Sequence, residues 1–326
     1  MKNALVTGAA GFIGSHLVEK LIAKGYAVTA FLHYNSQQSI GNLRFLDRRI
    51  LKDVKIVFGD ITDSFSVRSV VRQQDVVFHL AALIGIPYSY VAPLSYIQTN
   101  IIGTHNVLQA CLSCSVAHLV HTSTSEVYGS AQYLPINENH PLVGQSPYSA
   151  SKISADKLVE SFARSFGLSQ TTIRPFNTFG PRQSNRAVIP TIVSQVMQSK
   201  SIRLGNLHAE RDYTYVSDTV EAFLLADKIR PKIDGAINLG FGKCISVENL
   251  VNKIKILTGV DLSIQTENKR IRPQNSEVDC LLSDNALAKR VLGWEPTVSL
   301  DNGLMKCIGF ATSELNGIVN SDDYTI

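Results

Sequence analysis

A tyrosine and a lysine in the segment SPYSASK have the types and the spacing needed for proton transfer. Tyr148 and Lys152 are four residues apart at the start of a stretch with helical character, so both side chains lie on one helix face. A lysine ammonium beside a phenol stabilises the phenolate, and the tyrosine can then accept a proton near neutral pH. The spacing is common by chance, and its alternative interpretation is an ordinary surface helix face.

Two hydroxyls and a carboxylate follow the short apolar run AHLVH, in the segment HTSTSEVYG. Thr124, Ser125 and Glu126 therefore stand where a buried strand ends. Ligands of parallel sheets bind beyond the carboxyl ends of the strands, so these side chains are candidates for one chemical site. The alternative for Glu126 is a loop or helix-start carboxylate with no chemical role.

The N-terminal segment predicts the element that would hold a cofactor. An apolar strand over residues 3–7 runs into Gly8, Gly11 and Gly14, and the amphipathic helix that follows ends at Gly25. The first glycine permits a tight turn, the second lets the backbone approach a pyrophosphate, and the third lets helix and strand pack closely. Free N–H groups and the dipole at the helix start then hold the anion. This βαβ unit predicts dinucleotide binding.

Strands and helices alternate through the first part of the chain. Segments 54–63, 75–82, 117–125 and 169–177 each predict a strand with its C-terminal loop, and helices are expected around 94–112 and 147–166. Continuous apolar strands alternating with helices indicate a parallel sheet covered on both faces. We therefore predict an α/β protein in which residues 1–180 form a Rossmann-type, doubly wound NAD(P)-binding domain. Residues 181–326 form mostly a smaller, mixed α/β substrate domain, and a strand near 236–241 rejoins the first domain.

The end of the second strand, AFLHYNSQQ, bears on the choice of cofactor. An acid normally recognises the ribose at this point, and this segment has none. A 2′-phosphate would repel an acid and tolerate His33 and Asn35, so NADP is favoured over NAD, with Arg44 the nearest arginine. Asp60 is a candidate adenine contact or, alternatively, a strand-end turn residue. The predicted cofactor-binding residues are Gly8, Gly11, Phe12, Ile13, Gly14, His33, Asn35, Asp60, Ile61, Leu80, Ala81, Ala82, Tyr148 and Lys152.

Composition excludes several classes of protein. The formal charge of +4, without a Lys/Arg block, falls short of nucleic-acid binding and fits an anionic small molecule. No apolar run approaches the length of a membrane span, and no signal peptide is expected. Five scattered cysteines argue against a disulfide framework, and Cys111 and Cys114 are interpreted as helix-packing residues, so no metal site is predicted. We expect a cytoplasmic protein.

Together these motifs resemble the extended short-chain dehydrogenase/reductase superfamily. The likeness covers nearly the whole chain and includes GxxGxxG, GDITD, HLAA, Asn100 in TNIIGT, the Ser/Thr strand end, YxxxK and RPFNTFGPRQ. In that superfamily the residue at the position of Thr124 hydrogen-bonds the reacting sugar hydroxyl, and the tyrosine and lysine move the proton. The resemblance assigns those roles to Thr124, Tyr148 and Lys152.

Glu126 exceeds what a simple dehydrogenase or epimerase needs. Once a nucleotide sugar is oxidised at C4, the ketone acidifies the C5 proton, and a carboxylate could remove it while the C6 hydroxyl leaves as water. TSTSEVYG is similar to the catalytic stretch of nucleotide-sugar 4,6-dehydratases, with the Thr-Ser-Glu of the GDP-mannose enzymes rather than the Thr-Asp-Glu of the dTDP-glucose enzymes. Glu126 would then serve as both base and acid. The predicted catalytic residues are Thr124, Ser125, Glu126, Tyr148 and Lys152.

The segments LAALIGIPYSYVAPLSYIQTN, TSTSEVYGSAQYLPI and RPQNSEVDCLLSD are most similar to the dehydratases of bacterial legionaminic acid pathways. That family acts on nucleotide-linked N-acetylglucosamine, and the loop wall at Pro87 and Tyr88 would suit an N-acetyl group; core packing is the alternative. Arginine forks suit phosphate oxygens, which favours Arg211 and Arg272 for the diphosphate over surface ion pairs. By similarity to the family's motifs, the predicted substrate-binding residues are Tyr88, Ser89, Asn177, Arg182, Arg211, Arg272 and Glu277.

The sequence thus predicts an NADP-dependent enzyme that converts UDP- or GDP-N-acetylglucosamine to the 4-keto-6-deoxy sugar. A C4 epimerase, which shares the Thr/Tyr/Lys set, is the alternative within the superfamily. A non-catalytic cofactor-sensing protein is the alternative outside the enzymes. In the superfamily, the helices that carry Asn100 and Tyr148 usually pair across a two-fold axis, so the resemblance implies a homodimer.

Overall fold

The computed structural model describes residues 1–199, 201–230, 233, 235–267, 270 and 276–315. A seven-stranded parallel sheet has the strand order β10-β6-β5-β4-β1-β2-β3, which reverses between β1 and β4. Ligands of doubly wound sheets bind at that reversal. The α/β, Rossmann-type fold is therefore confirmed. The strands are β1 Asn3–Thr7, β2 Ala27–His33, β3 Val54–Gly59, β4 Val76–His79, β5 His118–Thr122, β6 Gln170–Pro175 and β10 Ala236–Leu239.

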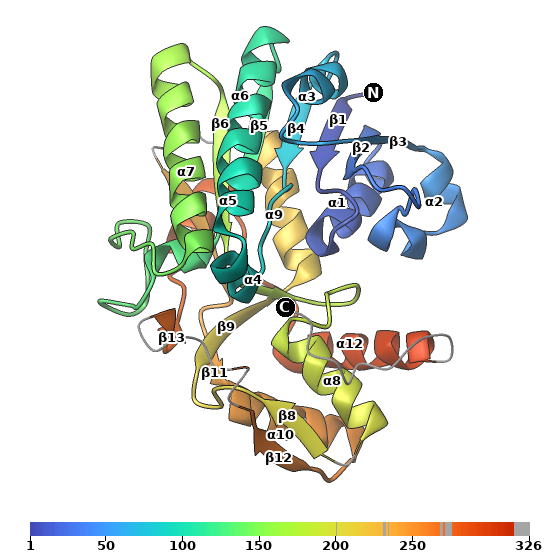
Figure 1. Cartoon of the computed structure of the whole chain (residues 1–326), viewed down its shortest axis with the longest axis vertical. Helices are drawn as coiled ribbons and strands as arrows, with labels where there is room; N and C mark the ends of the chain where they lie inside the picture. Colours follow the sequence, from blue (N-terminus) through green and yellow to red (C-terminus); the bar gives the residue numbers. More distant parts are fainter. Residues whose placement is uncertain (200, 231–232, 234, 268–269, 271–275, 316–326) are drawn as a thin grey trace.

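Helices cover both faces of this sheet because successive strand residues point to opposite sides (Figure 1). Leu5 packs in one buried cluster with Val107 and Val159 of α6 and α7, whereas its neighbour Val6 packs with Leu17 and Phe223 of α1 and α9. Helices α3, α6 and α7 share the first face, and α1 and α9 share the second. Their bounds are α1 Phe12–Ala23, α3 Ser64–Val71, α6 Gly103–Ser113, α7 Pro147–Phe166 and α9 Val216–Ile229; the short α2 is Arg48–Lys52 and η1 is Gly41–Phe45.

The helix expected around 94–112 is confirmed as an uninterrupted helical run over 93–113, which consists of α5 Pro93–Tyr96, the π-helical η2 Ile97–Ile102 and α6. A separate short helix, α4 Ile86–Val91, precedes it. Pro87 and Pro93 lie at the first turns of α4 and α5, where a missing N–H costs no intrahelical bond. The IPYSYV segment is thus a short helix, and the expectation of a loop was wrong.

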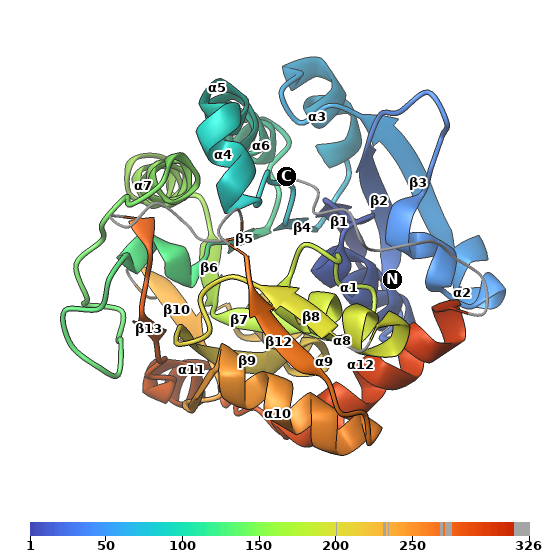
Figure 2. The same ribbon diagram turned by 60° about the horizontal axis from the view of Figure 1, so that its bottom comes forward.

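A smaller lobe of mixed α/β structure lies at the end of the large sheet toward which α4 projects (Figures 1 and 2). Its central strand β9 pairs with β7 and β13 in parallel and with β11 in antiparallel fashion. The elements α9 and β10, although they follow residue 180, pack with the large sheet. The lobe comprises β7 Asn177–Phe179, β8 Ser201–Leu204, β9 Glu210–Tyr215, β11 Cys244–Ser246, β12 Ser263–Thr266, β13 Cys280–Leu281, α8 Val188–Gln198, α10 Val247–Thr258, α11 Ala286–Leu292 and α12 Leu300–Leu315.

The structure also bears on the interpretation of the cysteines, on metal binding and on membrane spans. Cys111 is buried on α6 and Cys114 follows the last residue of that helix, which agrees with their interpretation as helix-packing residues. Among the residues that the structure describes, no group of His, Cys, Asp and Glu is placed to hold a metal ion. No helix in the described ranges has both the length and the apolar character needed to cross a bilayer.

Candidate active site

The glycine turn between β1 and α1 forms a narrow cradle. Gly8 has a φ of +68°, and a Cβ there would lie 2.8 Å from the backbone nitrogen of Ala81. A Cβ on Gly14 would lie 2.3 Å from the carbonyl oxygen of Gly8, so neither position accepts a side chain. Gly11 at the start of α1 brings no side-chain acceptor to the first N–H groups of the helix. The cradle therefore fits the pyrophosphate of a nicotinamide dinucleotide.

A threonine that sequence reasoning missed fixes the neighbouring loop. The Oγ1 atom of Thr7 accepts hydrogen bonds from the backbone nitrogens of Leu80 and Ala81, each at 3.1 Å, and lies 2.9 Å from Nδ1 of His79. The predicted cofactor residues Leu80, Ala81 and Ala82 are thereby held against the glycine turn. The position of Thr7, last in β1 and directly before Gly8, was the available signal.

Two of the side chains predicted to contact the adenosine, Asn35 and Asp60, make hydrogen bonds within their own loops. Oδ1 of Asn35 accepts from the backbone nitrogen of Ser39 at 2.8 Å, while His33 is exposed at the end of β2. The Asp60 carboxylate accepts from both the backbone and the hydroxyl of Thr62, each at 2.8 Å. Those bonds match the strand-end turn that was the alternative for Asp60, and its adenine contact stays a prediction. Ile61 is buried against Gly103 of α6.

The start of α7 positions the catalytic tyrosine. Ser146 and Ser149 form a reciprocal capping box, with the Ser149 N–H donating to Ser146 Oγ at 3.0 Å and the Ser146 N–H donating to Ser149 Oγ at 2.9 Å. Pro147 occupies the first turn, and Tyr148 and Lys152 follow on one face, each almost fully buried. The predicted helix over 147–166 is confirmed in both its ends.

Threonine, glutamate and tyrosine come together as predicted. Thr124 begins the short η3 turn, Ser125–Tyr128, and its Oγ1 accepts from the backbone nitrogen of Glu126 at 3.3 Å. The Tyr148 phenol is hydrogen-bonded to the Thr124 side chain and lies close enough to Glu126 for the carboxylate to raise the phenol's pKa. Ser125 is buried in the same turn. The segment that follows β5 thus places the Thr124 hydroxyl and the Glu126 carboxylate close to the Tyr148 phenol.

Burial dominates the electrostatics of the catalytic pair. It raises the pKa of the Tyr148 phenol well above 10, and the hydrogen bond with Thr124 opposes that rise only in part. Burial also lowers the pKa of Lys152 to about 8, and the Lys152 Nζ donates to the carbonyl oxygen of Thr122 at 2.7 Å. Stabilisation of the phenolate by the lysine, expected from the spacing, is therefore smaller in this structure than the desolvation of the phenol.

Asn100 braces this arrangement from the neighbouring helix. Its Oδ1 accepts from the backbone nitrogen of Leu83 at 2.8 Å, and its Nδ2 donates to Ser151 Oγ on α7 at 2.9 Å. The π-helical turn η2 places this amide at the join between α4 and α7, and π turns of this kind are frequent at functional sites. The Tyr96 ring packs edge-on against the Tyr148 ring, with their centroids 6.2 Å apart.

A buried ion pair behind the lysine was also missed. The Asp156 carboxylate accepts from Arg174 Nη2 at 2.8 Å and from Ser123 Oγ at 2.6 Å. Arg174 Nη1 in turn donates to the Tyr128 hydroxyl at 2.7 Å. The spacing of Asp156, one helical turn after Lys152, was a signal that the YxxxK pattern alone does not include.

On the substrate side, the structure brings two predicted residues together. A guanidinium nitrogen of Arg211 lies 3.8 Å from a carboxylate oxygen of Glu277, and Arg211 also donates to the backbone carbonyl oxygen of Glu210 at 2.9 Å. Asn177, on β7 beside β9, has a buried Oδ1 with no partner among the described residues. Arg272 lies outside the described residues. The substrate contacts of these side chains stay predictions.

Two other predicted substrate residues have contacts that differ from the expectation. Arg182 has a φ of +69°, and its guanidinium pairs with Glu19 of α1 at 2.7 Å, so here it joins the lobe to the cofactor-binding unit. Ser89 is fully buried, and its hydroxyl donates to the carbonyl oxygen of Ile86 at 2.7 Å within α4. Tyr88, on the same helix, is 37% exposed and is the better placed of the pair to meet a ligand.

A chain of hydrogen bonds connects the smaller lobe to both sides of the candidate site. The Tyr90 hydroxyl on α4 lies 2.5 Å from Ser276 Oγ, and Ser276 donates to the carbonyl oxygen of Gln145 at 2.8 Å. Gln145 directly precedes the capping box of α7, and Ser276 directly precedes Glu277. The predicted nucleotide contact is thereby tied to α4 and to the catalytic helix.

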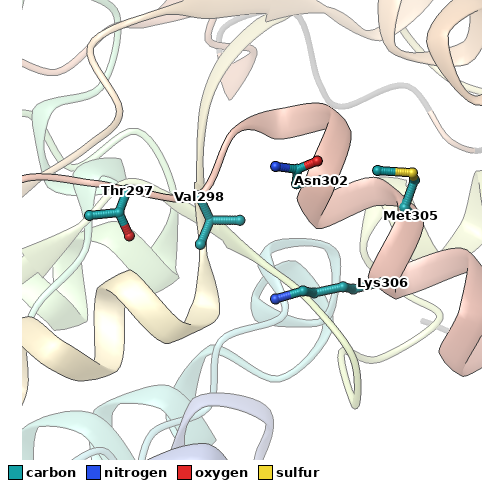
Figure 3. Close-up of a pocket in the computed structure, with 5 residues that line it drawn as sticks. All are labelled: Thr297, Val298, Asn302, Met305 and Lys306. Atoms are coloured by element: carbon teal, nitrogen blue, oxygen red, sulfur yellow. The ribbon is translucent and has the colours of Figure 1, made fainter.

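A surface pocket lies against α12 of the smaller lobe (Figure 3). It is lined by Thr297, Val298, Asn302, Met305 and Lys306, of which the last three lie on α12 and the first two on the segment that precedes it. Met305 is half exposed, and no predicted site residue lines the pocket. The convergence of titratable groups at β5 and α7 is therefore the better guide to the site.

Comparison with known proteins agrees with the geometry. The family model described as GDP-mannose 4,6 dehydratase matches residues 5–307. A putative UDP-glucose 4-epimerase from Methanocaldococcus jannaschii is 30% identical over 94% of this chain and 97% of its own length.

Two solved structures are similar over almost the whole chain. The UDP-glucose 4-epimerase of Thermotoga maritima, solved with UDP-glucose, gives a TM-score of 0.87 at 31% identity and covers 96% of this chain and 99% of its own. A dTDP-glucose 4,6-dehydratase from Streptomyces venezuelae, with NAD and TYD bound, gives 0.85 at 27% identity and covers 96% and 98%. The chain thus belongs to the extended short-chain dehydrogenase/reductase family of nucleotide-sugar dehydratases and epimerases, enzymes that use a nicotinamide dinucleotide.

Proposed function

We propose that this enzyme is a nucleotide-sugar 4,6-dehydratase that converts UDP- or GDP-N-acetylglucosamine to the 4-keto-6-deoxy sugar. The observation that carries the proposal is the place of Glu126: its charge acts on the Tyr148 phenol, which is itself hydrogen-bonded to Thr124. From this chain, a C4 oxidation needs only the phenol, the threonine and the lysine. The carboxylate beside them supplies the extra base that loss of water requires.

The chain's own side chains account for each proton. Tyr148 takes the proton of the C4 hydroxyl, which Thr124 orients, and the Lys152 ammonium stabilises the resulting phenolate. A nicotinamide dinucleotide held at the turn of Gly8, Gly11 and Gly14 would supply the hydride chemistry at C4 and C6. Glu126 removes the acidified C5 proton and gives it to the departing C6 hydroxyl, so one water leaves. When hydride adds to C6, C5 regains a proton, which balances the proton that Tyr148 took from the C4 hydroxyl, and the reaction is redox-neutral overall.

The sugar preference is proposed from α4. Tyr88 is 37% exposed and Ile84, just before the helix, is 69% exposed, so together they offer an apolar surface to an N-acetyl group. The resemblance of this segment to the dehydratases of bacterial legionaminic acid pathways supports the same sugar.

The cofactor preference is proposed from the end of β2. That segment lacks an acid and exposes His33, which favours NADP, although the dehydratase relative described above was solved with NAD. Titration of the cofactor-free protein with NADP and NAD, followed by quenching of its single tryptophan, Trp294, or by calorimetry, measures the ratio of dissociation constants. The NADP preference predicts a lower dissociation constant for NADP, and the reverse order would contradict it.

We also propose a homodimer and a cytoplasmic location. Leu94, Ile97 and Ile102 are each about half exposed or more on the segment that leads into α6, which supports pairing through that helix. Light scattering of the purified protein should give twice the mass of 35.7 kDa. The location is proposed from the scattered cysteines and from the sequence expectations of no signal peptide and no membrane span.

A C4 epimerase is the second candidate, favoured by the epimerase relatives. The Glu126→Gln variant separates the two. For a dehydratase, loss of the base should reduce formation of the dehydrated product by about 10²–10⁴-fold while reduction of the cofactor by the sugar continues. Largely unchanged turnover of the variant, with a product of unchanged mass, would favour the epimerase.

A further inference from the structure

The catalytic lysine is enclosed by charged and titratable groups from four elements. Lys152 is 4% exposed, and Asp156 lies one turn further along α7 at 8%. His79 of β4 and His121 of β5 face the lysine closely enough for its charge to lower the pKa of each ring. Arg174 of β6 completes the set through its ion pair with Asp156.

Asp156 carries the one negative charge among the groups named in this enclosure. Burial lowers the pKa of both His79 and His121, so both rings are neutral near neutral pH. Lys152 and Arg174 are then two buried cations, and the Asp156 carboxylate is the anion that acts on both. A buried lysine ammonium without a counter-charge loses its proton instead of staying charged.

The position of the carboxylate is fixed from three sides. Arg174 and Ser123 donate to Oδ2 at 2.8 Å and 2.6 Å, and His121 Nε2 lies 3.3 Å from Oδ1. Arg174 is itself held by the Tyr128 hydroxyl. Because these contacts come from β6, from β5 and from Ser123 directly after β5, the carboxylate is held by the sheet as well as by its own helix.

We propose that Asp156 is a positioning residue for the C4 oxidation: it supplies the buried counter-charge that keeps the Lys152 ammonium protonated beside Tyr148. Ser123 and Arg174 hold the carboxylate in place for this role. The inference rests on the proposed function only through its first step, the oxidation at C4, which a dehydratase and an epimerase share.

Removal of that charge should change how the lysine titrates. In Asp156→Asn, desolvation is no longer opposed, and the pKa of Lys152 should fall from about 8 by about two units or more. The lysine would then be largely neutral near neutral pH. The alkaline limb of the rate of cofactor reduction should move to lower pH with it.

The direct test is NMR of the cofactor-free protein labelled with ¹³C at lysine Cε. The Lys152 resonance is assigned by its loss in Lys152→Met, and its titration is compared in wild-type, Asp156→Asn and the control Glu160→Gln. Glu160 is the matched control because it lies one turn further along α7 and pairs with Lys157 and Arg164 at the surface. A shift to lower pH in Asp156→Asn alone supports the proposal, and an unmoved Lys152 titration overturns it.

A second variant covers the case in which Asp156→Asn does not fold. Arg174→Gln removes the cation that shares the carboxylate, so Lys152 should titrate at higher pH than in the wild-type protein. An unchanged or lower value would overturn the proposal. A melting temperature from circular dichroism shows which variants are folded.

Kinetics complete the test and separate it from the dehydratase proposal. Reduction of bound cofactor by a nucleotide sugar near neutral pH should fall at least about tenfold in Asp156→Asn, with partial recovery in Asp156→Glu. If cofactor reduction depends on Asp156 in this way but the product keeps its mass, only the dehydratase proposal fails. If water is lost but Lys152 titrates unchanged in Asp156→Asn, only the Asp156 proposal fails.

Discussion

The two sides of the candidate site differ in how their buried polar groups are partnered. On the catalytic side, the hydrogen bonds of Asp156, Arg174 and Tyr128 form a connected network that continues to Asn238 of β10. On the substrate side, the described residues offer no partner to the buried hydroxyl of Tyr213 or to Oδ1 of Asn177, which are paired in register across β9 and β7.

This difference indicates which side of the site is fixed before a ligand binds and which side is completed by the ligand. The connected hydrogen bonds of Asp156, Arg174 and Tyr128 fix the catalytic helix before any ligand arrives, which electrostatic catalysis requires, and leave only Nδ1 of His121 and Oγ1 of Thr122 unpartnered beside them among the described residues. Buried polar atoms without partners are rare because each costs free energy until it is satisfied. We therefore expect the substrate side to gain its missing hydrogen bonds on binding, and the catalytic side to change little.

The largest effect should come from the catalytic pair itself. Tyr148→Phe and Lys152→Met should each slow reduction of the cofactor by about 10²–10⁴-fold, because one removes the base and the other its charged partner. The exposed Tyr133→Phe is the control. Stopped-flow absorbance of the reduced nicotinamide measures the rate, and near-wild-type rates in either variant would place the proton transfer elsewhere.

Two matched tyrosine variants, one on each side of the site, test this comparison through the free energy of unfolding. Tyr128→Phe leaves Nη1 of Arg174 and Oδ1 of Asn238 without the hydroxyl that they contact, and should lower the free energy of unfolding by about 1–3 kcal/mol. Tyr213→Phe removes a hydroxyl that has no partner in the described structure, and should leave that free energy within about 0.5 kcal/mol or raise it.

Urea unfolding of the two variants measures both values. Equal destabilisation by the two substitutions would show that the two sides do not differ as described. Calorimetric titration with a nucleotide sugar then asks whether Tyr213→Phe weakens binding, as the unmet hydroxyl predicts.

A smaller effect concerns acid stability, where buried groups of the two halves act in opposite directions. Burial lowers the pKa of His118 on β5 from 6.5 to about 4. Between these two pH values His118 is protonated in the unfolded chain but not in the folded protein, so the free energy of unfolding falls as the pH falls. Burial raises the pKa of Asp212 on β9 from 3.8 to about 6, so the folded protein binds the proton first and gains stability as the pH falls.

Urea unfolding near pH 7 and near pH 5 tests both signs. Between these conditions His118→Gln should lose less stability than the wild-type protein and Asp212→Asn more, each by about 1–2 kcal/mol. A pH dependence identical to that of the wild-type protein in both variants would contradict the assignment of these shifts to burial.

The same contrast explains what could be predicted from the sequence. Gly8–Gly14, Thr124–Glu126 and Tyr148–Lys152 lie in contiguous motifs at strand and helix ends, and local spacing sufficed to place them. Asp156 and Arg174 meet only because β6 lies beside β5 in the sheet, which no local pattern expresses.

The substrate side was harder for the same physical reason. Arg182 was assigned to the diphosphate from a motif, but its left-handed backbone and its ion pair with Glu19 depend on how the lobe packs against α1. The helical form of Ile86–Val91 depends on packing as well, because an apolar run with a proline fits a loop or a short helix equally.

The most direct test of the account is the mass of the product formed in deuterated water. With a nucleotide-linked N-acetylglucosamine, the wild-type enzyme should yield a sugar lighter by one water that carries solvent deuterium at C5, and Glu126→Gln should not. A product of unchanged mass without deuterium at C5, from every nucleotide sugar offered, would contradict the role assigned to Glu126.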